Sequence, residues 1–235
     1  MQEITYVGNE LELFQHATVW KKYFGEKIKP FLKERVLEVG AGMGSTTLNL
    51  CDGSQKQWVC LEPDPSLFQI LKGRIEQQEL PSCCTAMKGT LQDLPPSKKF
   101  DTIMYIDVIE HIENDAQELN RAVSLLEPGG FLIVLVPAHQ FVFSEFDKSL
   151  GHYRRYNKEK LETIIPAGLK KEKLFYLDSL GLLASVVNKY FLKQDYPTLK
   201  QIIFWDKTIV RFSKVTDFLI NYQTGKSLIG IWQKV

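Results

Sequence analysis

A short apolar run that leads into three alternating glycines and then into a helix start constrains this chain more than any other stretch. Residues 36–47 read VLEVGAGMGSTT. The apolar run predicts a buried β-strand, and the Ser-Thr-Thr sequence predicts the first turn of a helix. Gly40, Gly42 and Gly44 between them permit positive φ angles and let a ligand come closer than a Cβ atom would allow. This pattern predicts a ligand-binding turn at the end of a strand; the alternative is a turn in which the glycines only permit tight packing.

The spacing of the glycines distinguishes two classes of ligand. The dinucleotide fingerprint is G-x-G-x-x-G, and its third glycine would fall where this chain has Ser45. Here the pattern is G-x-G-x-G, and Glu38 stands two residues before the first glycine. A carboxylate in this turn disfavours a diphosphate but suits a ligand that carries an ammonium and a sulfonium group. The stretch E-V-G-A-G-M-G resembles the first motif of class I S-adenosylmethionine-dependent methyltransferases.

Further motifs of the same family occur along residues 35–136. Glu62 ends the second predicted strand, 18 residues after Gly44, where a carboxylate can accept both hydrogen bonds of a ribose diol. The segment from Phe100 to His111 and the turn L-E-P-G-G before the apolar strand 131–136 resemble later landmarks of the family. The resemblance implies S-adenosyl-L-methionine as cofactor and S-adenosyl-L-homocysteine as product.

The resemblance also implies where the cofactor binds. At the adenine position, family members often carry the acid of a Gly-Asp-Ala sequence, whereas this chain has Thr90, with the backbone of Leu91 and the side chain of Asp93 nearby. The cofactor-binding residues expected from the motifs are Glu38, Gly40, Ala41, Gly42, Gly44, Thr46, Glu62, Pro63, Thr90, Leu91, Asp107 and Val108.

Strand and helix patterns alternate up to residue 136 and form five βα units, which predict a parallel sheet covered on both faces. The family resemblance implies an α/β fold, a three-layer α-β-α Rossmann-like doubly wound sheet of seven strands with the last one antiparallel. Strands six and seven are expected at residues 174–177 and 225–232. The 235 residues fit a single domain.

Two segments are expected to be additions to this domain. Residues 1–33 are predicted to be an N-terminal helical lid, the alternative being a helix that packs on the sheet. Residues 180–223 form an insertion between strands six and seven that combines apolar and basic residues. We expect this insertion to be a helical cap, with a dimer face or a membrane-surface contact as alternatives.

The segment after the fifth strand concentrates polar chemistry where ligands of α/β sheets bind. It includes G-H-Y-R-R-Y at residues 151–156 and resembles a D…GHYRRY element of a bacterial subset of the family, associated with glycan and lipid-linked sugar biosynthesis. Two adjacent arginines can clamp a phosphate or carboxylate; alternatively, one of them pairs with Asp147 or Glu145 to fix the loop. The predicted substrate-binding residues are Asp147, Arg154, Arg155 and Trp20.

Methyl transfer needs alignment of the reactants and at most one general base. The candidates for this base are His139, His152, Tyr153 and His111, all predicted near the ends of strands four and five. No set of histidine, cysteine and carboxylate residues has metal-ligand spacing, so no metal is predicted.

Composition limits the remaining function classes. The net charge is +1, and no long basic run is present, so a nucleic-acid partner is not expected. Neither a signal peptide nor a spanning apolar stretch is recognisable, and the four cysteines lack C-x-x-C spacing, so we expect a cytoplasmic protein with reduced thiols. The predicted function is methyl transfer to a small-molecule or lipid- or sugar-linked acceptor. Two alternatives are a nicotinamide-dependent oxidoreductase, disfavoured by Ser45, and a non-catalytic module that binds through residues 180–223.

Overall fold

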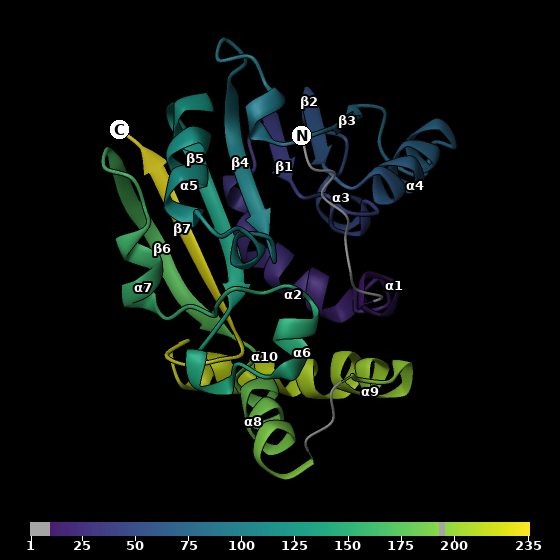
Figure 1. Cartoon of the computed structure of the whole chain (residues 1–235), viewed down its shortest axis with the longest axis vertical. Coiled ribbons are helices and arrows are strands. Elements are labelled where there is room, and N and C mark those ends of the chain that lie inside the picture. The colour runs from purple at the N-terminus through teal and green to yellow at the C-terminus, as the bar shows by residue number, and fades with distance from the viewer. Residues whose placement is uncertain (1–9, 193–195) are drawn as a thin grey trace.

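The computed structural model describes residues 10–192 and 196–235. Within these residues, one seven-stranded sheet has the order β3-β2-β1-β4-β5-β7-β6 (Figure 1). Strands β1 to β5 are parallel, and β7 is antiparallel to both of its neighbours, β5 and β6. This arrangement confirms the predicted fold class. The strands are β1 (Arg35–Val39), β2 (Gln57–Glu62), β3 (Cys84–Lys88), β4 (Phe100–Ile106), β5 (Leu126–Pro137), β6 (Leu169–Leu177) and β7 (Ser227–Lys234).

Helices cover both faces of the sheet and the carboxyl ends of its parallel strands. The α-helices in the described part of the chain are α1 (Glu10–Phe14), α2 (Thr18–Ile28), α3 (Ser45–Leu50), α4 (Pro65–Glu76), α5 (Asp115–Leu125), α6 (Glu145–Ser149), α7 (Lys158–Thr163), α8 (Ser179–Val187), α9 (Leu199–Phe204) and α10 (Val210–Leu219). A π-helical turn, Trp205–Ile209, joins α9 to α10.

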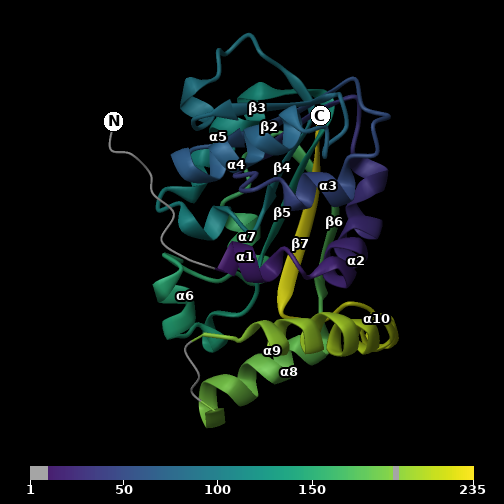
Figure 2. The same cartoon turned by 90° about the vertical axis from the view of Figure 1, so that its right-hand side faces the viewer.

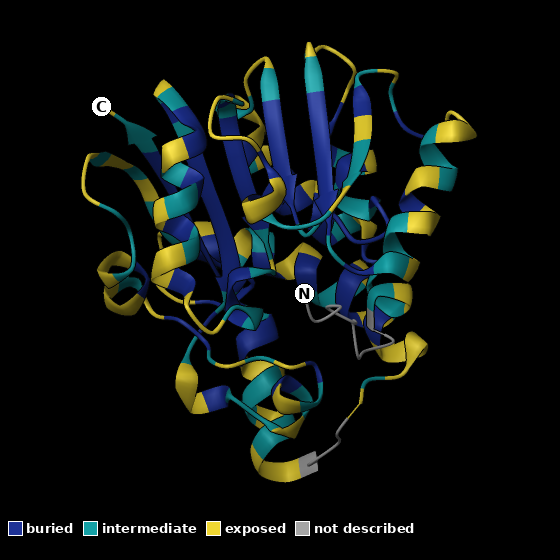
Figure 3. Cartoon of the chain, turned by 45° about the horizontal axis from the view of Figure 1, so that its top comes forward, coloured by how far each residue is buried: buried dark blue, intermediate teal, exposed yellow. Residues whose placement is uncertain are grey.

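Alternate residues of the strands supply two apolar layers, as the two-residue period of a strand requires. One layer contains Val36, Trp58 and Cys60 and packs under α2, α3 and α4. The other contains Leu37 and Val59 and packs under α5 and α7. The central strands are therefore buried on both faces, and exposed residues lie mainly on the outer helix surfaces, in the loops and on the edge strands β3 and β6 (Figure 3).

Strand β5 begins earlier than the apolar run predicts. Leu126 already pairs with Phe100, and the register then jumps so that Phe131 pairs with Thr102. The predicted tight turn at residues 127–130 therefore lies inside the strand as an outward bulge, in which Gly129 has a φ of 74°. Strand β6 is also longer than expected and begins at Leu169 because it pairs with β7 up to Lys234.

The two segments expected to be additions lie at the carboxyl ends of the parallel strands (Figures 1 and 2). There α1 lies next to α9 and α2 next to α10, while α8 packs against α10. Residues 1–9 of the expected lid and residues 193–195 of the expected cap lie outside the described residues. Lid and cap remain predicted roles for these segments. Among the described residues, none of the helices combines the length and the apolar character needed to cross a bilayer.

Candidate active site

The glycine turn between β1 and α3 has the backbone that its sequence predicts. Gly40, Gly42 and Gly44 have φ angles of 66°, 56° and 78°, a region that side chains with a Cβ atom rarely adopt. A Cβ atom on Gly40 would lie 2.6 Å from Val108 Cγ2. The Gly40 N–H donates to the carbonyl oxygen of Leu61 at 2.8 Å, so the turn is held against the end of β2.

Glu62, at the end of β2, is bound to the same turn. Its Oε2 accepts the Gly42 N–H at 2.7 Å, and its Oε1 accepts the Asp64 N–H at 2.9 Å. Burial raises the pKa of this carboxyl, and the two N–H groups act in the opposite direction. The side chain is 4% exposed and faces the cavity described below. Pro63 ends the strand at this point because it has no N–H to donate.

A cavity of about 1170 Å³ extends from the glycine turn across the ends of β2, β4 and β5. Pockets for single small ligands commonly enclose about 300–1,000 Å³, so there is room for a cofactor together with a second molecule. The predicted cofactor-binding residues that line the cavity are Gly40, Ala41, Gly42, Thr46, Glu62, Pro63, Thr90, Asp107 and Val108. The predicted substrate-binding and catalytic residues that line it are Trp20, His111, Asp147, His152, Tyr153 and Arg155.

Five predicted site residues do not line this cavity: Glu38, Gly44, Leu91, His139 and Arg154. Glu38 and Leu91 are buried in the layers beside the sheet. The ring of His139 instead stacks on Tyr176, with centroids 4.8 Å apart.

Asp147 is the centre of the G-H-Y-R-R-Y segment. Arg155 Nε donates to Asp147 Oδ1 at 2.7 Å and Arg155 Nη2 to Oδ2 at 3.0 Å, while His152 Nδ1 lies 3.0 Å from Oδ1. Burial alone would raise the pKa of Asp147, but the hydrogen bonds from His152 and Arg155 hold it well below its usual range. Because both bonds of this ion pair go to Asp147, the Arg155 guanidinium fixes the loop, as in the alternative that the sequence left open.

Arg154 points to the other side of this loop. Its Nη1 donates to Asp115 Oδ2 at 2.7 Å, and its Nη2 donates to the carbonyl oxygen of Glu113. Tyr156 donates its hydroxyl to the same Asp115 oxygen at 2.8 Å. Both arginines of the segment therefore anchor it to the fold, and neither presents a free guanidinium to an anion.

Glu110 and His111 enter the cavity wall from the turn Ile109–His111, which follows β4. Glu110 is 0% exposed, and neither of its carboxylate oxygens has a hydrogen-bond partner among the described residues. Burial, together with the carboxylate of Asp107, raises the pKa of Glu110 well above its usual value. Burial lowers the pKa of His111 to about 4, helped by the nearby His152. The two rings meet edge to face, with centroids 4.5 Å apart.

Sequence reasoning did not select some residues that line the cavity. Glu110 was considered only as part of the segment from Phe100 to His111, although it directly precedes His111, a predicted catalytic residue. Lys21 and Lys226 come from α2 and from the loop before β7, and no local pattern distinguishes them from surface lysines. The helix α6 was not predicted, although Ser144 and Asp147 form a capping box at its start.

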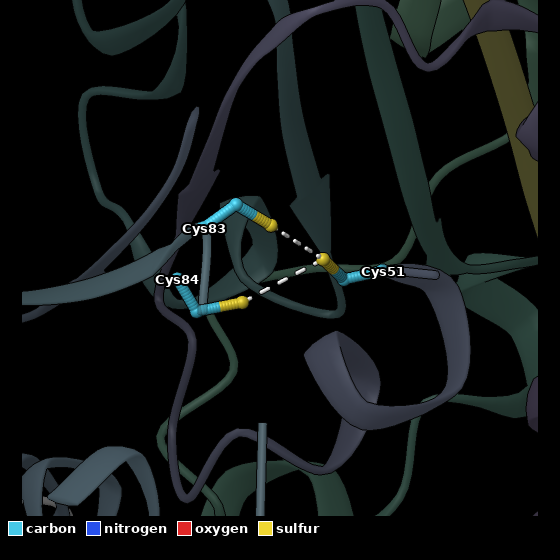
Figure 4. A group of neighbouring side chains, drawn as sticks. All are labelled: Cys51, Cys83 and Cys84. Carbon is cyan, nitrogen blue, oxygen red and sulfur yellow. Dashed lines mark hydrogen bonds between the residues drawn. The ribbon is translucent and has the colours of Figure 1, made fainter. Parts of the chain in front are cut away.

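Three cysteines that are distant in sequence meet at the other end of the sheet, outside the cavity (Figure 4). Cys51 Sγ lies 3.4 Å from Cys83 Sγ and 3.6 Å from Cys84 Sγ. A hydrogen bond from Cys84 lowers the pKa of Cys51 to about 6. These thiols form one of two clusters with the geometry of metal ligands in the described chain; the other is Glu110, His111 and His152. Neither cluster has a spacing that the sequence reveals.

Comparison with known proteins gives a family match over most of the chain. The family model described as "Methyltransferase domain" matches residues 14–178. A tRNA U34 carboxymethyltransferase of Syntrophotalea carbinolica is 31% identical over 46% of this chain and 33% of its own length. A ubiquinone biosynthesis O-methyltransferase of Bradyrhizobium sp. is 27% identical over 43% of this chain and 38% of its own length. The chain thus spans well under half the length of these curated relatives.

Solved structures share the fold over nearly the whole chain. An S-adenosylmethionine-dependent methyltransferase of Thermotoga maritima, described as a possible histamine N-methyltransferase, has a TM-score of 0.62 and 20% identity, covering 97% of this chain and 95% of its own. The N-methyltransferase NodS of Bradyrhizobium japonicum, solved with S-adenosyl-L-homocysteine, has a TM-score of 0.57 and 14% identity, covering 93% and 85%.

Proposed function

This chain belongs to the methyltransferase domain family, and on that premise we propose that it transfers a methyl group from S-adenosyl-L-methionine to a small-molecule or lipid- or sugar-linked acceptor. The family confirms the expected enzyme class and the expected cofactor. It sets aside the nicotinamide-dependent oxidoreductase and does not favour the non-catalytic module. The acceptor and the activity of the whole protein are our proposals, as is the cytoplasmic location.

The observation that carries the proposal is the position of Glu62 between the glycine turn and the cavity. Its carboxylate is buried and held by two N–H groups, and each oxygen keeps a lone pair for the hydroxyls of a ribose. The residues of this wall fit S-adenosylmethionine, because the glycine turn lets a ligand approach the backbone and Asp107 offers a carboxylate to its ammonium group. Thr90 and its neighbours Gln92 and Asp93 line the part of the cavity proposed for the adenine.

The remaining walls of the cavity are proposed to hold the acceptor. Apolar side chains from α1, α2 and α6 line it, including Phe14, Trp20 and Phe146, and they exclude water from the reaction. When bound, S-adenosylmethionine supplies a methyl group on a sulfonium, which an aligned nucleophile can displace in line. His111, His152 and Tyr153 are the predicted catalytic residues that we propose face this nucleophile.

The D…GHYRRY resemblance supports a narrower proposal, that this chain belongs to the bacterial subset with lipid- or sugar-linked acceptors. Because both arginines of the segment are engaged internally, we propose that the segment shapes the acceptor side of the cavity through His152 and Tyr153 rather than by clamping a phosphate. Trp20, which is 7% exposed and lines the cavity, is the proposed apolar contact for the acceptor.

A membrane-surface contact through residues 180–223 is a further part of the proposal. Large apolar side chains are exposed on α8 and α10, among them Phe212 at 62% and Phe218 at 70%. Within residues 196–223 both acidic residues, Asp206 and Asp217, are buried, so the exposed charges there are basic. Exposed apolar and basic residues together favour the surface of an anionic membrane, where a lipid-linked acceptor would be found.

Calorimetric titration with S-adenosylmethionine, S-adenosylhomocysteine and NADH tests the proposed activity at its first step. We expect micromolar binding of both adenosyl ligands and no heat with NADH. Glu62→Ala should weaken S-adenosylmethionine binding by roughly ten- to a hundredfold, because hydrogen bonds to a charged group contribute about 1.5–3 kcal/mol. Glu76→Ala removes an exposed carboxylate of α4 and is the matched control. Unchanged affinity in Glu62→Ala would contradict the assignment of the cofactor site.

A further inference from the structure

We propose that Glu110, His111 and His152 bind a divalent first-row transition cation, which holds the acceptor oxygen during methyl transfer. The inference rests on the proposed function and extends it to the chemistry of the acceptor. One potential ligand atom from each residue lies within 4.8 Å of the other two, and all three residues line the cavity. Two imidazoles and a carboxylate with open positions form a donor set typical of catalytic Zn²⁺, Fe²⁺ and Mn²⁺ sites.

The carboxylate of Glu110 points to a ligand independently of the cluster. It is fully buried, and neither oxygen has a hydrogen-bond partner among the described residues. A buried carboxyl group without partners is costly, and native structures almost always satisfy such groups. Glu62 accepts N–H groups from two other residues, whereas in the described chain the only N–H directed at the Glu110 carboxylate is its own. The carboxylates of Asp107 and Asp147 repel a negative charge at Glu110, and Arg155 offsets this only in part. A cation is the ligand that satisfies both oxygens and offsets the surrounding negative charge.

Both histidines have the outer partners that metal ligands usually have. His152 places Nδ1 against Asp147 Oδ1 at 3.0 Å, which leaves Nε2 for a ligand. Asp147 is itself held by Arg155 and by the N–H of Ser144. His111 is hydrogen-bonded to the backbone of Leu150, which leaves its other ring nitrogen available. Partners of this kind fix the orientation of a ligating imidazole and its free nitrogen.

The position of the cluster determines what the cation would do. Glu110 and His111 lie in the turn after β4 and Asp107, His152 follows α6, and all three line the same cavity as Glu62 and the glycine turn. Three protein ligands leave positions for an acceptor with a hydroxyl and a second oxygen on the neighbouring carbon, such as a vicinal diol or a catechol. The cation lowers the pKa of the bound hydroxyl, whose proton passes to water. The acceptor oxygen then forms a bond to the methyl carbon as the carbon–sulfur bond breaks, and the electron pair of that bond stays on sulfur.

The cysteine cluster determines which cation to use as a probe. Cys51, Cys83 and Cys84 would compete for Zn²⁺, since thiolates are soft ligands. Mn²⁺ prefers oxygen and nitrogen donors, and its paramagnetism reports the free ion directly. Titration of the chelator-treated chain, residues 1–235, with MnCl₂, followed by electron paramagnetic resonance, therefore measures the proposed site without interference from the thiols.

We expect one Mn²⁺ per chain in the wild-type protein. Glu110→Gln and His152→Gln should each weaken Mn²⁺ binding by at least about a hundredfold, since even outer partners of metal ligands contribute about 10–100-fold. Glu113→Gln, an exposed neighbour that does not line the cavity, should bind Mn²⁺ as the wild type does. Urea unfolding and S-adenosylmethionine titration of the same samples show that each variant is folded.

The outcomes separate the two proposals. Normal S-adenosylmethionine binding without any Mn²⁺ binding would overturn the cation site and leave the methyltransferase proposal standing. Mn²⁺ binding that survives in Glu110→Gln and His152→Gln would also overturn it, because the ion would lie elsewhere. Mn²⁺ binding at this cluster without binding of either adenosyl ligand would support the site and contradict the proposed function.

Discussion

Glu38 shows how a side chain beside the cavity can serve the fold rather than a ligand. Its Oε2 accepts hydrogen bonds from Thr47 Oγ1 at 2.7 Å and from Trp58 Nε1 at 2.9 Å. The residue is 2% exposed, and burial raises the pKa of its carboxyl group from 4.5 to about 7. Glu38 thus connects β1 to α3 and β2 beneath the glycine turn, and its neutral form is favoured in the folded chain.

This raised pKa predicts a pH-dependent stability that Glu38→Gln should remove. The unfolded chain releases the proton of Glu38 near pH 4.5, while the folded chain retains it up to about pH 7. Stability is therefore lost as pH rises between these values. Since one pKa unit corresponds to about 1.4 kcal/mol, the variant should exceed the wild type by roughly 3 kcal/mol in unfolding free energy at pH 8 and by little at pH 4.

Urea unfolding of both proteins across this pH range checks the prediction. Glu34→Gln is the control, because Glu34 is an exposed partner of Lys56 and lies immediately before the same strand. A constant difference between Glu38→Gln and the wild type at all pH values would mean that folding does not raise the pKa of Glu38.

The sequence predicts best those site residues that lie close together in the chain. The glycine turn and Glu62 were predicted because strand end, turn and helix start are adjacent in the chain. Glu38 was predicted as a cofactor ligand from the same motif, but alternation along β1 places it with Val36 on the face covered by α3, beside Cys60 and Trp58. The motif alone does not say toward which face of the strand a side chain points.

At the scale of elements, α2 depends on a residue far away in the sequence. Its N-terminus has no side-chain cap of its own at Ala17. Instead, Asp206 from the π-helical turn accepts the N–H groups of Val19 at 3.1 Å and Trp20 at 2.8 Å. The partners are separated by 187 and 186 residues. Patterns within a short window cannot predict such a cap, and the sequence therefore left open whether residues 1–33 are a lid or a helix that packs on the sheet.

Asp206→Ala should destabilise the protein through α2. The substitution leaves one buried and one partly buried N–H group without acceptors, which predicts a loss of about 3 kcal/mol in unfolding free energy. Asp206→Asn keeps an acceptor oxygen and should recover part of the loss. The control is Glu26→Ala, which removes an exposed contact between α2 and Lys214 and should change stability by less than about 1 kcal/mol. Urea unfolding measures all three; equal stability of Asp206→Ala and the wild type would show that α2 needs no cap from this turn.

At the scale of the whole molecule, the exposed residues of α10 have a clear arrangement. Phe212, Val215 and Leu219 recur at helical spacing and are more than half exposed. The opposite side of α10 carries Ser213 and Asp217, both buried, and Asp217 accepts the N–H groups of Asp178 and Ser179. The helix therefore uses its polar residues to attach itself to the domain and leaves an apolar face outward, the reverse of the usual amphipathic pattern.

A face of this kind predicts binding to anionic vesicles. Burial of two phenylalanines in the interface would contribute several kcal/mol, about 1.5–3 for each side chain, and each nearby lysine or arginine about 1 kcal/mol at an anionic surface. Co-sedimentation with phosphatidylglycerol vesicles measures how much protein binds the membrane. The double variant Phe212→Ser/Phe218→Ser should bind at least about tenfold more weakly than the wild type. The control Ile70→Ser, which replaces an exposed residue of α4, should bind as the wild type does. Neutral vesicles should bind more weakly. A dimer that dissociates in the double variant, without vesicle binding by the wild type, would identify the face as a contact between two copies of the chain.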